Sequence, residues 1–141
     1  MDQFGVVVSA GSLQDDAGAG VVRFPHRWTD AGVTVRADFT GAHLLHLAAA
    51  GCVLNDLYRE AAGLGIPLDG VRVTAAGAFD TTTWTSTGIT YTVELDSPGN
   101  DGVLAGLLAR VDEIAEIPRA IRAGAQVTRN SSNGASNAAP L

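Results

Sequence analysis

The residue best suited to chemistry is a single cysteine, Cys52, which lies inside a strongly apolar stretch of the chain. Asp56 follows it by four residues and Arg59 by seven, so a helix places all three on one face. The thiolate is the reactive form of cysteine, and burial or a nearby carboxylate keeps the thiol protonated. Cys52 could therefore be a nucleophile activated by a cation from elsewhere in the fold, for which Arg36 is the candidate, or an inert apolar side chain.

Two histidines, His43 and His46, lie at the start of the same stretch, where a spacing of three makes them neighbours on a helix. A metal site needs a third ligand at a suitable spacing, and the sequence offers none, so we predict no metal and no cofactor. We expect both histidines to line a ligand pocket instead. His43 could also hydrogen-bond to a ligand or to a backbone carbonyl.

The composition indicates one globular domain, since 46% of the 141 residues are hydrophobic and 17% are charged. The formal net charge of -6 argues against partners such as nucleic acid or an anionic membrane, because phosphates would be repelled. No apolar run reaches membrane-spanning length, and the N-terminal residues lack the basic region of a secretory signal. One cysteine cannot form an internal disulfide framework, so we expect a cytoplasmic location.

The strongest helical pattern covers residues 42–62, where only the two histidines are polar before Leu54. A helix that is apolar on nearly all sides must be buried on nearly all sides. One small domain covers such a helix poorly, whereas a second copy of the chain would complete the cover. We therefore predict a homodimer with Cys52 buried at or near the interface. Thr40 could cap this helix, and Gly65 could end it.

The rest of the chain predicts strands, one further long helix and a short helix with Pro118 in its first turn. The predicted segments are strands at 4–9, 21–28, 31–39, 71–79 and 87–95, a helix at 101–116, and a last strand at 124–129. Clustered strands followed by helices indicate an α+β fold rather than a parallel α/β sheet. We expect residues 1–128 to form a single domain and the Ser/Asn/Ala-rich tail, 129–141, to be disordered.

The centre of the chain resembles the OsmC/Ohr family, that is, osmotically inducible protein C-like and organic hydroperoxide resistance protein-like proteins. The resemblance covers roughly residues 31–128. It rests on Leu44-Leu45, the alanine-rich run before Cys52, Gly65-Ile66-Pro67, Gly70-Val71-Arg72-Val73, and Ile117–Thr128. The resemblance implies antiparallel sheets wrapped around a buried central helix, in an intertwined homodimer with two sites at its interface.

The resemblance also implies a peroxidase-like activity in oxidative stress defence, the thiol-dependent reduction of organic hydroperoxides. Cys52 matches the family's peroxidatic cysteine. Arg36 best matches the arginine that holds the thiolate, and Arg23 is the second match.

The other two functional positions of the family have changed in this chain. The family's glutamate, which orients the arginine, falls at Ala42 or His43, and neither carries a carboxylate. The family's resolving cysteine falls at Ile117, directly before Pro118. A histidine cannot offer arginine the bidentate fork of a carboxylate.

Two functions from different classes therefore remain open. The first is a one-cysteine hydroperoxide reductase in which Cys52 is the nucleophile, Arg36 lowers its pKa, and an external thiol is the reductant. The second is a non-catalytic homodimer that binds a small apolar ligand at the subunit interface. The retained cysteine favours the first, and the loss of the acid and of the second cysteine favours the second.

Overall fold

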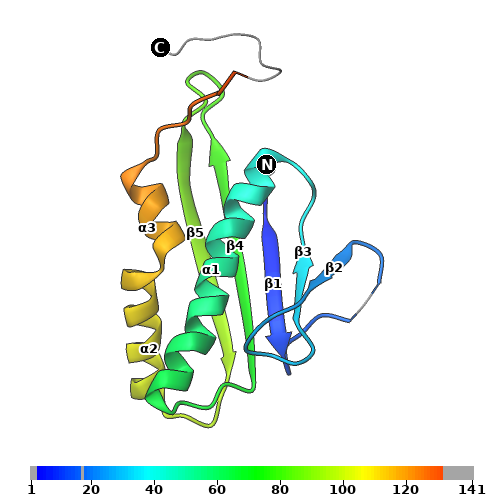
Figure 1. Cartoon of the computed structure of the whole chain (residues 1–141), viewed down its shortest axis with the longest axis vertical. Coiled ribbons are helices and arrows are strands. Elements are labelled where there is room, and N and C mark those ends of the chain that lie inside the picture. Colours follow the sequence, from blue (N-terminus) through cyan, green and yellow to red (C-terminus); the bar gives the residue numbers. More distant parts are fainter. Residues whose placement is uncertain (1–2, 17, 132–141) are drawn as a thin grey trace.

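The computed structural model describes residues 3–16 and 18–131, which form five strands and three helices (Figure 1). In chain order the elements are β1 (Val6–Gly11), β2 (Val21–Phe24), β3 (Val33–Arg36), α1 (Gly41–Leu64), β4 (Gly70–Phe79), β5 (Ser86–Asp96), α2 (Asp101–Ile114) and α3 (Glu116–Ala123). The prediction of an α+β fold is confirmed.

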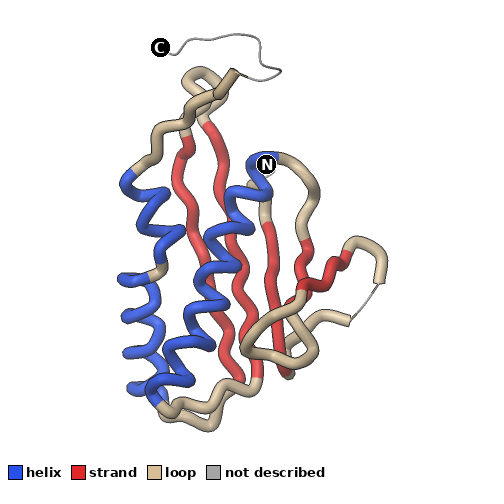
Figure 2. The backbone as a smooth tube through the Cα atoms, in the orientation of Figure 1, coloured by secondary structure: helices blue, strands red, loops and turns tan. Residues whose placement is uncertain are grey.

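The strands form one sheet in the order β2-β3-β1-β4-β5, and every neighbouring pair is antiparallel. Val8 lies opposite Val35 on one side and Val73 on the other, so these three side chains share the face against which α1 packs. Figure 2 shows α1 crossing this face, with α2 and α3 beside it on the side of β5. One chain therefore places a single sheet on one side of α1.

The core lies between α1 and the sheet and is closed on one side by α2. Leu54 and Leu57 of α1 are buried against valines of β1, β3 and β4, and α2 adds Leu107 and Val111. Full burial of each such side chain stabilises the fold by roughly 1.5–3 kcal/mol. This packing fixes the rotation of α1, and with it the direction in which Cys52 points.

Both predicted ends of the central helix are confirmed. The Thr40 side chain accepts a hydrogen bond of 3.1 Å from the His43 backbone N–H, and Gly65 ends the helix in the left-handed conformation, with φ of 68°. The helix is not buried on all sides within one chain, because Ala48 is exposed and 39% of Leu44 is exposed. The homodimer that would cover these residues stays a prediction.

The predicted strand at 124–129 is wrong. Residues 124–131, the described residues after α3, form no strand, and Val127 is 93% exposed. Alternating residues in a sequence do not supply the neighbouring strand that a ladder needs. The second strand, predicted at 21–28, ends at Phe24, directly before Pro25, which has no backbone N–H for a ladder.

The tail predicted to be disordered is 129–141. Its residues from 132 onward lie outside the described part of the chain, which ends at Ser131. Within the described part of the chain, no helix combines the length and the apolar character needed to cross a membrane.

Candidate functional site

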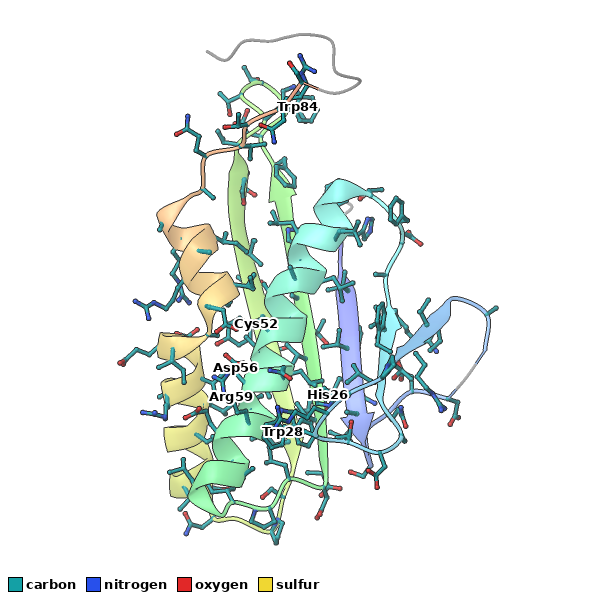
Figure 3. All side chains as sticks on the ribbon, in the orientation of Figure 1. His26, Trp28, Cys52, Asp56, Arg59 and Trp84 are labelled. Atoms are coloured by element: carbon teal, nitrogen blue, oxygen red, sulfur yellow. The ribbon has the colours of Figure 1, made fainter. Side chains whose placement is uncertain are left out.

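Cys52 lies in the middle of α1, on the flank that faces α2 and α3, and Asp56 and Arg59 follow on the same flank (Figure 3). The helical spacing of four and seven residues predicts this arrangement. The short connection between α2 and α3 brings Glu116, the first residue of α3, against the sulfur. The site therefore joins the middle of one helix to the start of another.

The Cys52 sulfur faces two carboxylates. Its Sγ lies 3.4 Å from Oε1 of Glu116 and 3.9 Å from Oδ2 of Asp56. The backbone N–H of Ile117 also points at the sulfur. A thiol has one proton and can donate it to one carboxylate at a time. Cys52 is partly rather than fully buried in the single chain, and its expected place at a subunit interface stays a prediction.

These surroundings raise the pKa of the Cys52 thiol to about 11, chiefly because burial disfavours the charged thiolate. The Ile117 N–H opposes this shift, since it hydrogen-bonds to the sulfur and favours the charged form. Asp56 and Glu116 both raise the pKa further, because a thiolate would face two negative charges. The resting form at neutral pH is therefore the protonated thiol.

Asp56 is fully buried and stands between the thiol and the nearest guanidinium of its own helix. Its Oδ1 accepts from Asn55 Nδ2 at 3.3 Å and pairs with Arg59 Nη1 at 3.2 Å, which leaves Oδ2 facing the sulfur. Burial raises the pKa of Asp56, although Asn55 and Arg59 act against that shift. The order of groups is thiol, carboxylate, guanidinium, so the positive charge reaches the carboxylate and not the sulfur.

Glu60 ties this flank of α1 to α2. Its Oε1 accepts from Arg110 Nε at 2.6 Å, and its Oε2 accepts from Arg59 Nε at 3.4 Å. The hydrogen bond from Arg110 is the largest cause that lowers the pKa of Glu60. Arg59 is thus held between Asp56 and Glu60, and both interactions point its guanidinium away from the thiol.

His26 reaches the same network from the loop between β2 and β3. Its Nε2 lies 3.2 Å from Oδ1 of Asn55, and its Nδ1 lies 2.9 Å from Oγ1 of Thr29. Sequence reasoning missed His26, Asn55 and Glu116. The only signal was that Glu116 precedes Ile117, the position matched to the family's second cysteine, and the structure does bring this segment to Cys52.

The predicted arginines lie on the sheet face opposite α1. Arg36 follows Val35, whose side chain enters the core, so the Arg36 side chain points the other way and its Nε donates to Asp15 Oδ2 at 3.0 Å. Arg23 lies opposite Thr34 in the register and shares that outer face. One chain brings neither guanidinium to Cys52, and their catalytic role stays a prediction.

Both predicted histidines are buried at the start of α1. His43 Nδ1 lies 2.7 Å from the Thr40 hydroxyl, and His46 Nδ1 donates to the Phe4 carbonyl at 2.8 Å. His46 also lies tightly against Gly77, where an added Cβ would stand 2.9 Å from its Nε2. Neither histidine lines the hollow described next, and their expected role in a ligand pocket stays a prediction.

An apolar hollow of about 230 Å³ opens between α1, β5 and α3, one turn of α1 before Cys52. Its walls include Ala49, Ile89, Tyr91, Pro118, Ile121 and Arg122. Arg122 is the only charged side chain among the lining residues that the structure describes. Concave, mostly apolar surfaces with one or two fixed polar groups are typical of sites for small ligands.

A cation could also be considered at the thiol. The donor atoms of Cys52, Asp56 and Glu116 lie within 4.8 Å of one another, and a thiolate with two carboxylates is a donor set that zinc accepts. Arg59 already pairs with Asp56, and this group includes no histidine. We assign no metal to it.

Fold and site together define an α+β domain in which a long helix presents one thiol beside an antiparallel sheet. A family model described as OsmC-like protein matches residues 33–130, which is more than half of the chain. The chain therefore belongs to the OsmC-like protein family, as the resemblance of its central segment predicts.

Solved structures agree with this fold at low sequence identity. An OsmC-like protein from Mycoplasma pneumoniae is 14% identical, with a TM-score of 0.56 over 77% of this chain and 89% of its own. An OsmC-like hydroperoxide resistance protein from Jannaschia sp. CCS1 is 11% identical, with a TM-score of 0.51 over 95% of this chain and 97% of its own. At these identities the similarity shows the fold alone. A comparison with curated proteins gave no match.

Proposed function

We propose that this OsmC-like protein binds a small apolar ligand in the hollow between α1, β5 and α3. The observation that carries this proposal is the contrast between the hollow and the thiol beside it. The hollow has mostly apolar walls, whereas Cys52 faces the carboxylates of Asp56 and Glu116. Ligand binding requires the hollow, but it does not require a reactive thiol.

The surroundings of the sulfur argue against a fast peroxidatic cysteine in the single chain. Attack on a hydroperoxide uses the thiolate, and a pKa of about 11 leaves very little thiolate at neutral pH. The predicted activating group, Arg36, pairs with Asp15 on the far face of the sheet. Arg59 lies on the same flank of α1 as Cys52, but Asp56 stands between it and the thiol.

Hydroperoxide reduction by Cys52 is the second candidate, and one observation favours it. The backbone N–H of Ile117, at the start of α3, points at the sulfur and lowers the pKa of the thiol. In such a cycle the sulfur would take the terminal oxygen of the hydroperoxide and release the alcohol, leaving a sulfenic acid. Cys52 is the only cysteine, so two external thiols would have to reduce the sulfenic acid to thiol and water, forming their own disulfide.

Both candidates include a homodimer in a reducing, cytoplasmic compartment. The exposed apolar positions Leu44 and Ala48 on α1 support a second copy as the cover of this helix. A single cysteine without a disulfide partner supports the compartment. Sedimentation at micromolar concentration should give about twice the monomer mass of 14.4 kDa, and a stable, folded monomer would contradict the dimer.

Two assays on the same set of variants separate the candidates. The first follows binding of a neutral, environment-sensitive apolar dye, and the second follows thiol-dependent removal of an organic hydroperoxide. The variants are Cys52→Ser, Ile121→Gln inside the hollow, and Ile114→Gln as a matched control on α2 outside it.

We expect wild type and Cys52→Ser to bind the dye equally, Ile121→Gln to bind it several-fold more weakly, and Ile114→Gln to match wild type. Hydroperoxide removal should stay near the background without protein. Rapid removal that Cys52→Ser abolishes would favour the peroxidase. Dye binding that is absent, or that ignores Ile121→Gln, would remove the binding proposal.

A further inference from the structure

Among the described residues that line the apolar hollow, Arg122 is the only cation, and two contacts with Asp112 orient it. Its Nη2 lies 3.0 Å from Oδ1 of Asp112, and its Nη1 donates to the Asp112 backbone carbonyl at 3.2 Å. The Tyr91 hydroxyl donates to the same Oδ1 at 2.6 Å. These contacts join α3, α2 and β5 around one guanidinium.

The guanidinium keeps free donors after these contacts. A guanidinium has five N–H groups, and the two bonds to Asp112 use one hydrogen on each terminal nitrogen. The other three N–H groups form no hydrogen bond with a described residue, so they can donate to a ligand. A planar, permanently charged group of this kind matches the two oxygens of a carboxylate.

Asp112 pairs with Arg122 and offsets part of its charge, but this carboxylate lies outside the apolar hollow. Asp112 borders the neighbouring surface hollows but not the apolar one, and its Oδ1 already accepts from Tyr91 and Arg122. These hydrogen bonds, the one from Tyr91 first, lower the pKa of Asp112, so its carboxylate stays ionised and keeps Arg122 in place. Glu113 and Arg119 border a different, open hollow, which Arg122 also borders, and neither of them lines the apolar one.

We propose that the hollow takes a small amphipathic carboxylate, with its apolar body between Ala49, Ile89 and Ile121 and its carboxylate on Arg122. This inference rests on the proposed binding function and names the class of ligand. The volume of about 230 Å³ is below the roughly 300–1,000 Å³ of pockets for drug-sized ligands, so the apolar body is short. Octanoate and its neutral counterpart, 1-octanol, are a matched pair of probes.

The test is calorimetric titration of both probes into wild type, Arg122→Gln and a control, Arg119→Gln, because Arg119 does not line the apolar hollow. Wild type should bind octanoate at least about tenfold more tightly than octanol, a difference of about 1.4 kcal/mol. Arg122→Gln should reduce octanoate affinity to that of octanol and leave octanol affinity unchanged, and Arg119→Gln should behave as wild type.

Equal binding of both probes by wild type, without an effect of Arg122→Gln, would overturn the carboxylate preference and leave the apolar binding site intact. Binding of neither probe would remove the proposed function as well. If Arg122→Gln does not fold, the salt dependence of wild type decides the point. High salt should reduce the preference for octanoate over octanol, because it screens the charged pair, and an unchanged preference would overturn the inference.

Discussion

One turn of α1 separates two surroundings that differ in kind. Cys52 faces the carboxylates of Asp56 and Glu116, whereas Ala49 faces an apolar hollow with one guanidinium at its edge. The first surroundings hold a thiol in its protonated form, and the second offer volume to a ligand. One helix therefore offers space for a ligand one turn away from a thiol that faces two carboxylates.

The largest expected effect comes from introducing a second cysteine. Because the Ile117 backbone N–H points at the Cys52 sulfur, Ile117→Cys should form a disulfide with Cys52 on treatment with a mild oxidant. Mass spectrometry under non-reducing conditions should show loss of two hydrogens in nearly all molecules. Ile121→Cys, one turn further along α3, is the control and should keep both thiols. Free thiols in oxidised Ile117→Cys would mean that α3 does not place residue 117 beside Cys52 of α1.

A second prediction compares the two sides of α1. Leu57 is fully buried, so Leu57→Ala should lower the free energy of unfolding by about 2–5 kcal/mol at every protein concentration. Leu44 is partly exposed in one chain. In the proposed homodimer, the loss in free energy of unfolding caused by Leu44→Ala should instead depend on protein concentration. Chemical denaturation of both variants across a range of concentrations checks this. A Leu44→Ala effect that ignores concentration would count against an interface at this position.

The third prediction removes the negative charge around the thiol. Asp56→Asn combined with Glu116→Gln should lower the pKa of Cys52, because both carboxylates raise it, while burial keeps it above the ordinary value. Alkylation of Cys52 at neutral pH should become several-fold faster, since more thiolate is present although each thiolate is somewhat less nucleophilic. Glu113→Gln, an acid away from the sulfur, is the control. Equal alkylation rates in all three proteins would show that the carboxylates do not govern the thiol.

The smallest expected effect is on alkaline stability. The folded pKa of Cys52, about 11, is raised above the ordinary value of 9.0, so its contribution is fully present below pH 9 and is lost as pH rises to 11. The loss is at most about 2–3 kcal/mol, and less because the thiol is partly exposed. In Cys52→Ser, the free energy of unfolding should therefore fall less steeply from pH 9 to pH 11. Tyr58 and Tyr91 are present in both proteins, so they do not account for the difference. Identical slopes from pH 9 to pH 11 would contradict the raised pKa.

The sequence predicted the framework of the fold because its strongest signals are local. The apolar run between Thr40 and Gly65 identifies α1 with its cap and its end, and the spacing of Cys52, Asp56 and Arg59 predicts their shared flank. The strand at 124–129 failed because pairing depends on a neighbour that a local pattern does not contain.

The surroundings of the sulfur could not be predicted from spacing. Glu116 is 64 positions from Cys52 in the chain, and its contact depends on the packing of α3 against α1. The outward direction of Arg36 follows from strand alternation, but its pairing with Asp15 depends on the fold of the loop that follows β1. Long-range contacts of this kind decide the charge at the site, and they follow from tertiary structure.

Titration of the Cys52 thiolate in the wild-type protein tests the central claim most directly. Cys52 is the only cysteine, so the ultraviolet absorbance of thiolate, corrected with Cys52→Ser, reports on this residue alone. We expect an apparent pKa near 11 and a protonated thiol at neutral pH. An apparent pKa at or below neutrality would show that a cation reaches the sulfur in the assembled protein, and it would contradict the claim that burial, reinforced by two carboxylates, keeps this thiol protonated.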